Sequence, residues 1–141
     1  MLRSLMLALV VMLGAAPLAA EMPEALMYKN PQCGCCEEYA TYLRRNGFKV
    51  TVKETHNMSL ISQQNGVPEK LAGCHTMLVG GYVVEGHVPV GAINRLLKER
   101  PHIKGIALPG MPEGSPGMIG VKTGPFTIYE ISDEAKVFME E

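Results

Sequence analysis

The chain has 141 residues, a length that suits one domain with a single hydrophobic core. Its 13 basic and 14 acidic residues give a formal net charge of −1 at pH 7. No basic patch or long run of one charge stands out, which argues against nucleic acid as a partner.

The N-terminus has the layout of a secretory signal peptide. One positive charge at Arg3 is followed by the apolar run LMLALVVMLGAA and the small-residue segment APLAA, before the first acid at Glu21. An apolar run of about a dozen residues is short for a membrane span, which needs about 20. We therefore predict a signal peptide over residues 1–20, with an uncleaved anchor as the alternative, and no membrane span in the mature protein.

Residues 25–64 alternate between strand and helix patterns. Residues 25–29 (ALMYK) predict a short buried strand, which Asn30 and Pro31 end. A helix is expected over residues 35–46, because Cys36, Tyr39 and Leu43 recur at helical spacing. A second strand at residues 50–54 and a second helix at residues 58–64 follow.

Residues 76–101 predict a hairpin and a third helix. The runs TMLV and YVVE are separated by Gly80 and Gly81, which favour a type I′ turn because both central positions need a positive φ. A helix is expected to start at Pro89 and to stop at Pro101. The resulting order β-α-β-α-β-β-α is that of a thioredoxin-like fold, so the sequence predicts an α/β protein.

The last part of the chain differs in composition from this unit. LPGMPEGSPGMIG, at residues 108–120, is rich in Gly and Pro and repeats Pro-Gly-Met at Met111 and Met118. FTIYEI, at residues 126–131, predicts one more strand. We expect residues 21–102 to form the thioredoxin-like domain, and residues 103–141 to form a C-terminal extension that packs on the same domain.

Three cysteines stand together at the predicted junction of the first strand and the first helix. Cys33 and Cys36 have the C-x-x-C spacing of a redox disulfide, and Cys35 lies between them. A helix N-terminus stabilises a thiolate, and the thiolate is both the redox nucleophile and the metal ligand. The motif therefore fits disulfide exchange and metal binding alike, while a purely structural bridge would close a very small loop and contribute little stability.

A fourth cysteine, Cys74, helps to separate these interpretations. Glutaredoxin-like chains carry a cis-proline before the third strand, facing the active cysteine. Here His75 occupies roughly that position and Cys74 precedes it, so both are expected next to the CGCC segment. The absence of the proline weakens the disulfide-exchange interpretation, and a thiol with an imidazole in its place strengthens the metal interpretation.

The candidate ligands favour copper. Soft thiolate and thioether ligands select Cu(I), and imidazole also binds copper or zinc, whereas zinc prefers four well-separated ligands. His87 caps the next helix, lies on the surface or faces the site, and His56 and His102 are expected on the surface. The candidate ligands are Cys33, Cys35, Cys36, Cys74 and His75, with Met111 and Met118 on the extension.

The signal peptide, YKNPQCGCC, GCHTMLVGGYVVEGHVP and GMPEGSPGM together resemble the CopG-type periplasmic copper-resistance proteins, a family formerly described as a domain of unknown function. The resemblance implies a periplasmic, thioredoxin-like protein whose C-terminal extension contributes to metal binding. It also implies a cysteine-bridged multinuclear copper cluster at Cys33, Cys35, Cys36 and Cys74, with His75, Met111 and Met118 as further ligands. The implied role is interconversion of Cu(I) and Cu(II) before efflux, with a periplasmic efflux system or a redox partner. We expect a monomer.

Two other functions stay open at this point. One is a thiol–disulfide oxidoreductase with Cys33 as nucleophile and Cys36 as resolving thiol. The other is a metallochaperone that carries a single Cu(I). The sequence leaves open whether the protein is a copper oxidoreductase in the turnover sense. YKNPQC also resembles the loop of glutaredoxin-like arsenate reductases, but Arg44 and Arg45 lie at the far end of the helix, too distant to hold an oxyanion there.

Overall fold

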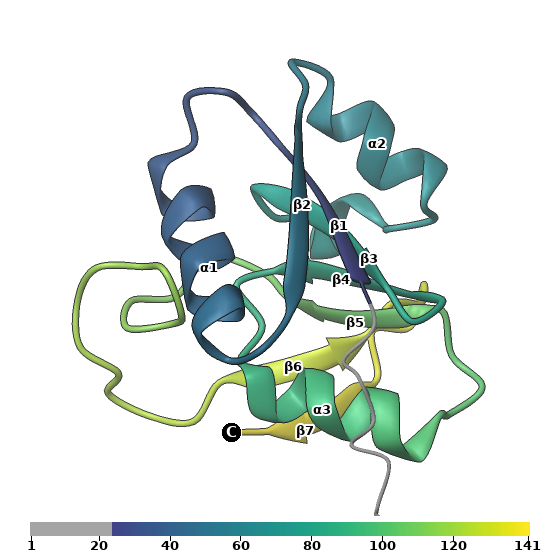
Figure 1. Cartoon of the computed structure of the whole chain (residues 1–141). Helices are drawn as coiled ribbons and strands as arrows, with labels where there is room; N and C mark the ends of the chain where they lie inside the picture. The colour runs from purple at the N-terminus through teal and green to yellow at the C-terminus, as the bar shows by residue number, and fades with distance from the viewer. Residues whose placement is uncertain (1–23) are drawn as a thin grey trace, which may run out of the picture.

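The computed structural model describes residues 24–141, so the predicted signal peptide at residues 1–20 lies outside the described residues. The described chain is a mixed α/β structure in which helices pack against one sheet (Figure 1). None of its helices is long and apolar enough to cross a membrane. In chain order, the elements are β1 (Glu24–Lys29), α1 (Gly34–Arg45), β2 (Lys49–Glu54), α2 (Met58–Gln64), the 3-10 helix η1 (Glu69–Leu71), β3 (His75–Val79), β4 (Tyr82–Gly86), α3 (Val90–Glu99), β5 (Gly105–Leu108), β6 (Thr127–Glu130) and β7 (Val137–Glu140).

The order of the elements confirms the predicted α/β fold class. The strands lie in the order β2-β1-β3-β4-β5-β6-β7. β1 is parallel to β2 and antiparallel to β3, and β3 forms the predicted antiparallel hairpin with β4 across Gly80 and Gly81. This arrangement of the first four strands and three α-helices is compatible with a thioredoxin-like core.

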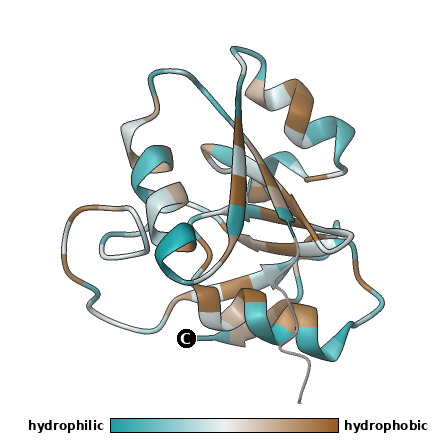
Figure 2. Cartoon of the chain, in the orientation of Figure 1, coloured by the Kyte–Doolittle hydropathy of each residue, from teal (hydrophilic) through white to brown (hydrophobic). Residues whose placement is uncertain are grey.

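Both faces of the sheet are covered, which gives the fold two apolar layers. Tyr39 and Leu43 of α1 share one buried cluster with Ile93 and Leu96 of α3. The residues around η1, including Leu71, pack on the other face in a smaller cluster. Figure 2 shows hydrophobic stretches along the central strands and on one side of α3. The larger cluster reaches the N-terminal end of α1, where the cysteines lie.

The C-terminal residues continue the same sheet. β5 is parallel to β4, β6 is antiparallel to β5, and β7 is antiparallel to β6. The single strand predicted at residues 126–131 corresponds to β6, whereas β5 and β7 were not predicted. Gly105 explains the close approach of β5, because a Cβ there would lie 1.8 Å from the Val83 carbonyl oxygen of β4.

Candidate metal centre

A tight turn leads from β1 into α1 and fixes the first cysteine. The Cys33 amide donates to the Asn30 carbonyl at 3.0 Å, and the Gln32 amide donates to Asn30 Oδ1 at 3.0 Å. Cys33 is the N-cap residue of α1, which begins at Gly34. The three clustered cysteines therefore lie at the strand–helix junction that the sequence predicted.

A buried lysine holds this turn in place. Lys29 Nζ lies 2.9 Å from Glu37 Oε1 of α1 and 3.3 Å from Glu54 Oε1 at the end of β2, and it donates to the Asn30 carbonyl at 3.2 Å. The hydrogen bond that Lys29 donates to Glu37 raises the pKa of Lys29 against the opposing effect of burial. Lys29 carries no signal of this role in the sequence, although it immediately precedes the Asn-Pro-Gln-Cys turn.

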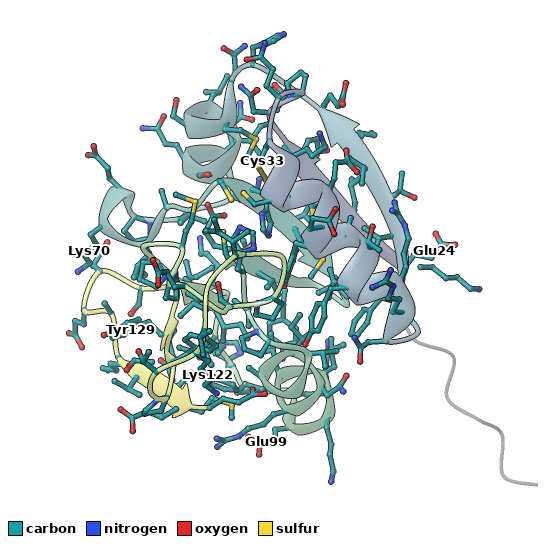
Figure 3. The ribbon with its side chains drawn as sticks, turned by 90° about the vertical axis from the view of Figure 1, so that its left-hand side faces the viewer. Glu24, Cys33, Lys70, Glu99, Lys122 and Tyr129 are labelled. Carbon is teal, nitrogen blue, oxygen red and sulfur yellow. A yellow bond between two sulfur atoms is a disulfide. The ribbon has the colours of Figure 1, made fainter. Side chains whose placement is uncertain are left out.

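The four cysteine sulfurs form a closed ring beside the start of α1. Figure 3 shows yellow sulfur atoms close to the labelled Cys33. Cys33 and Cys36 are joined in a disulfide, and Cys35 and Cys74 are free. Cys35 Sγ lies 3.5 Å from Cys33 Sγ, Cys74 Sγ lies 3.5 Å from Cys36 Sγ, and Cys35 Sγ and Cys74 Sγ are 4.0 Å apart. Cys74, which immediately precedes β3, thus adds a fourth sulfur to the three of the C-x-C-C segment.

Two imidazoles extend this group on the Cys74 side. Cys74 Sγ lies 3.4 Å from His75 Nδ1 and 3.1 Å from His87 Nε2. The three residues form a second candidate metal-binding set, which shares Cys74 with the sulfur ring. Of the three alternatives that the sequence left for His87, namely helix cap, surface or metal site, the structure places it at the site. His56 and His102 are exposed.

The extension sets the proton position on His87. His87 Nδ1 lies 2.7 Å from the Pro116 carbonyl oxygen. Because a carbonyl can only accept, Nδ1 carries the proton and donates it, which leaves the lone pair of Nε2 facing Cys74 Sγ. Burial lowers the pKa of His87, so the ring is neutral near pH 7. A backbone oxygen of the extension therefore prepares this nitrogen to bind a metal ion.

His75 is also neutral and packs against Tyr39. It is fully buried, and burial together with the nearby His87 lowers its pKa to about 3. The Tyr39 ring stacks on it with a centroid distance of 4.5 Å, and Tyr39 is held by a 2.8 Å hydrogen bond from its hydroxyl to the Val88 carbonyl. His75 Nε2 is buried without a hydrogen-bond partner. Nδ1, the ring nitrogen that faces Cys74 Sγ, is therefore the His75 atom placed to bind a metal ion.

The Gly/Pro-rich loop of the extension packs directly on α1. A Cβ on Gly117 would lie 2.7 Å from the Tyr39 amide nitrogen and 2.8 Å from the Cys35 carbonyl oxygen, so only glycine allows this approach. The two methionines predicted as ligands are on the same loop. Met111 is 41% exposed, and Met118 is half-buried with its amide bonded to the Ser115 carbonyl.

The spacing and the charge of the sulfurs fit a shared metal ion. Two thiolates bound tetrahedrally to one ion, each at about 2.3 Å, lie about 3.8 Å apart. This is close to the 3.5–4.0 Å separations between the sulfurs of the ring that are not joined in the disulfide. Burial, with a further contribution from the neighbouring Cys35, raises the pKa of Cys74 to about 12. Two thiolates this close repel each other in the absence of a cation, so an ion that neutralises both would favour their ionised forms.

Comparison with known proteins agrees with this geometry. The family model described as "Protein of unknown function, DUF411" matches residues 71–118. The solved structure named "Copper resistance protein copG- Form 2" is 37% identical, with a TM-score of 0.78, over 86% of this chain and 99% of that chain. Its counterpart named "Form 1" is also 37% identical, with a TM-score of 0.77, over 86% of this chain and 98% of that chain. No curated protein sequence matches the chain.

Proposed function

The chain belongs to the CopG family of copper resistance proteins, and from this premise we propose that it binds copper through its cysteine cluster. The observation that carries the proposal is the ring of four sulfurs, which shares Cys74 with two buried neutral imidazoles. Thiolates select Cu(I), and imidazoles accept copper in either oxidation state. The ligand residues are Cys33, Cys35, Cys36, Cys74, His75 and His87, with Met111 and Met118 as further candidates on the extension.

We propose that the site holds more than one copper ion. The two donor sets that share Cys74 offer six sulfur and nitrogen ligands, more than one four-coordinate ion uses, and bridging thiolates can be shared between ions. The proposed role is interconversion of Cu(I) and Cu(II) ahead of efflux, in the periplasm, by a monomer that delivers copper to an efflux system or exchanges electrons with a redox partner. The support for this finer role is the mixture of soft sulfur and harder nitrogen donors at one site.

The affinity of the fully reduced chain for Cu(I), measured by competition with a chromogenic chelator, tests the proposal. Cys35→Ser and Cys74→Ser should each weaken binding strongly and lower the number of bound ions, because each removes a sulfur that faces two others. His87→Ala should weaken binding about 10- to 100-fold. His102→Ala is the matched control, since His102 is exposed, and it should leave binding unchanged. Unaltered binding in Cys35→Ser and Cys74→Ser would exclude the cysteine cluster as the copper site.

A second candidate function is thiol–disulfide exchange, which the Cys33–Cys36 disulfide favours. In this function Cys33, the more exposed of the pair, is the nucleophile and Cys36 resolves the mixed disulfide. It requires neither Cys35 nor Cys74. Reduction of a protein disulfide substrate by a Cys35→Ser/Cys74→Ser double variant, at the rate of the unaltered chain, would support it. A third candidate, a carrier of a single Cu(I), predicts one bound ion per chain.

A further inference from the structure

We propose that Glu85 is a positioning residue for the imidazole side of the metal site, because it holds, from the opposite face of the sheet, the backbone that presents Cys74 to His87. The inference rests on the proposed copper binding and assigns a role to a residue outside both donor sets. It is carried by the burial of Glu85, by a hydrogen bond from the Gly73 amide to its carboxyl group, and by a close crossing of two glycines.

The Glu85 side chain lies on the face of the sheet away from the metal site. It is fully buried, and Ser62 of α2 donates a hydrogen bond to its Oε1 at 3.2 Å. Ser62 Oγ also lies 3.0 Å from the hydroxyl of Thr76, the β3 residue that pairs with Glu85 in the sheet. The His87 ring instead packs against Tyr39 of α1, on the other face, with their centroids 5.3 Å apart. The carboxyl group therefore acts on the metal ligands through the backbone that it holds.

Gly86 explains how Glu85 and His87 come to face opposite sides of the sheet. Residues two positions apart on a regular strand share a face. Gly86, the last residue of β4, has a φ of 75°, a conformation that favours glycine, and the chain leaves the strand there. A Cβ at Gly86 would also lie 2.5 Å from the Leu108 carbonyl oxygen of β5. The turn at Gly86 therefore directs the next residue, His87, to the α1 side.

The segment that carries Cys74 crosses β4 at this same glycine. Gly73 lies between η1 and β3, and a Cβ on it would be 2.9 Å from Gly86 Cα. This close crossing brings the two following residues together, with Cys74 Sγ 3.1 Å from His87 Nε2. The Gly73 amide donates to Glu85 Oε1 at 2.8 Å. The carboxyl group therefore fixes the crossing, and through it the separation of the sulfur and the nitrogen.

The hydrogen-bond acceptor at position 85 is therefore expected to set the affinity of the site for metal. Without it, the Gly73 segment is free to move away from β4 and takes Cys74 with it. Groups that orient metal ligands typically contribute about 10- to 100-fold in metal affinity. Glutamine has a side-chain carbonyl oxygen that accepts the same bond, whereas leucine fills a similar space without an acceptor. Glu85→Gln should therefore preserve the site, and Glu85→Leu should loosen it.

The contact between Cys74 and His87 can be followed in the metal-free chain, in the disulfide form of the structure. Nitrogen NMR of the histidine rings resolves Nε2 of His87, whose resonance depends on the hydrogen bond that this nitrogen accepts. Cys74→Ala supplies the reference spectrum of His87 without the thiol. We expect Glu85→Leu to move the His87 Nε2 resonance towards this reference and Glu85→Gln to leave it in place.

Two further variants separate positioning from a general loss of stability. Ser62→Ala removes another hydrogen bond of the same carboxyl group and leaves the Gly73 bond in place. It should lower the urea midpoint of unfolding without moving the His87 resonance. Gly73→Ala keeps the carboxyl group, but its new Cβ pushes the segment away from Gly86. It should move the His87 resonance as Glu85→Leu does, and it decides the question if Glu85→Leu does not fold.

Competition for Cu(I) with a chromogenic chelator, on the fully reduced variants, measures the consequence for metal binding. We expect Glu85→Leu and Gly73→Ala to weaken Cu(I) binding about tenfold or more, and Glu85→Gln and Ser62→Ala to stay within about threefold of the unaltered chain. An unmoved His87 resonance in Glu85→Leu and Gly73→Ala, or Cu(I) binding in them as tight as in the unaltered chain, would overturn the inference. So would a Glu85→Gln variant that behaves like Glu85→Leu.

The NMR measurement also separates this inference from the proposed function. An unaltered chain that binds no Cu(I) would refute the proposed copper binding. The His87 resonance of the metal-free variants would still decide whether Glu85 sets the contact between Cys74 and His87.

Discussion

Replacing Gly117 by alanine tests whether the extension loop supports the metal site. The new Cβ would lie 2.7 Å from the Tyr39 amide nitrogen and 2.8 Å from the Cys35 carbonyl oxygen, and these are backbone atoms of α1 that cannot yield. The loop must then lift from α1, which separates the Pro116 carbonyl from His87 Nδ1. Gly110 provides a matched control, because it lies in the same loop with the same φ of 82° but a Cβ there meets nothing within 4 Å.

The magnitudes of the two changes follow from these contacts. A non-glycine residue at positive φ costs about 1 kcal/mol, which both variants share. Gly117→Ala additionally loses the hydrogen bond that His87 donates to the Pro116 carbonyl, and the packing of the loop on α1. The total loss in the free energy of unfolding is about 2–4 kcal/mol. Loss of a group that orients a metal-binding histidine typically weakens metal binding 10- to 100-fold.

Chemical denaturation and Cu(I) competition, run on both variants, measure these effects. We expect Gly110→Ala to lose about 1 kcal/mol of stability and to weaken copper binding less than about fivefold. Gly117→Ala should lose more stability and more copper affinity than Gly110→Ala. Equal stability and equal copper affinity in the two variants would refute the conclusion that the loop rests on α1 and orients His87.

Three further changes test other parts of the structure. Lys29→Met should lower the free energy of unfolding by about 1–3 kcal/mol because it removes a buried cation with several hydrogen-bond partners, and the exposed Lys98→Met should have no comparable effect in the same urea denaturation. Burial raises the pKa of Glu85, so above the unfolded pKa of about 4.3 the folded chain keeps a proton that the unfolded chain loses. The free energy of unfolding should therefore fall with rising pH, by up to about 1.4 kcal/mol per pH unit, until the folded pKa is passed. Glu85→Gln should remove this slope. The same slope in the variant would disprove its assignment to Glu85. Because the pKa of Cys74 is about 12, Cu(I) must displace its proton, and competition titrations should show affinity rising up to about tenfold per pH unit below that value; a pH-independent affinity would contradict this.

Local patterns predicted the elements that carry the cysteines. The helical spacing of Cys36, Tyr39 and Leu43 placed α1 within one residue of its observed ends, and two glycines placed the β3–β4 hairpin. These signals are strong because they depend on periodicity and turn chemistry within one segment. β5 and β7 were missed because neither GIAL nor VFME alternates between apolar and polar residues, as the predicted segment FTIYEI around the equally short β6 begins to do.

The sequence predicted the site residues whose neighbours follow from a local motif. It left open the residues whose role depends on contacts with distant segments. The position of Cys74 and His75 before a strand sufficed to place them near the C-x-C-C segment. His87 stayed ambiguous, because its role depends on the Pro116 carbonyl of a loop 29 residues further on. The buried Lys29 gave no signal, since its partners Glu37 and Glu54 are brought together only by the folded sheet and α1.

Counting the copper ions bound by the fully reduced chain tests the central claim most directly. Native mass spectrometry during an anaerobic titration with Cu(I) resolves each metal-loaded species by its mass. The four-sulfur ring, with thiolates shared between ions, predicts a species that carries several Cu(I) ions and forms cooperatively. A plateau at one ion would replace the cluster with a carrier of single ions, and a chain that retains no Cu(I) would contradict copper binding at these cysteines altogether.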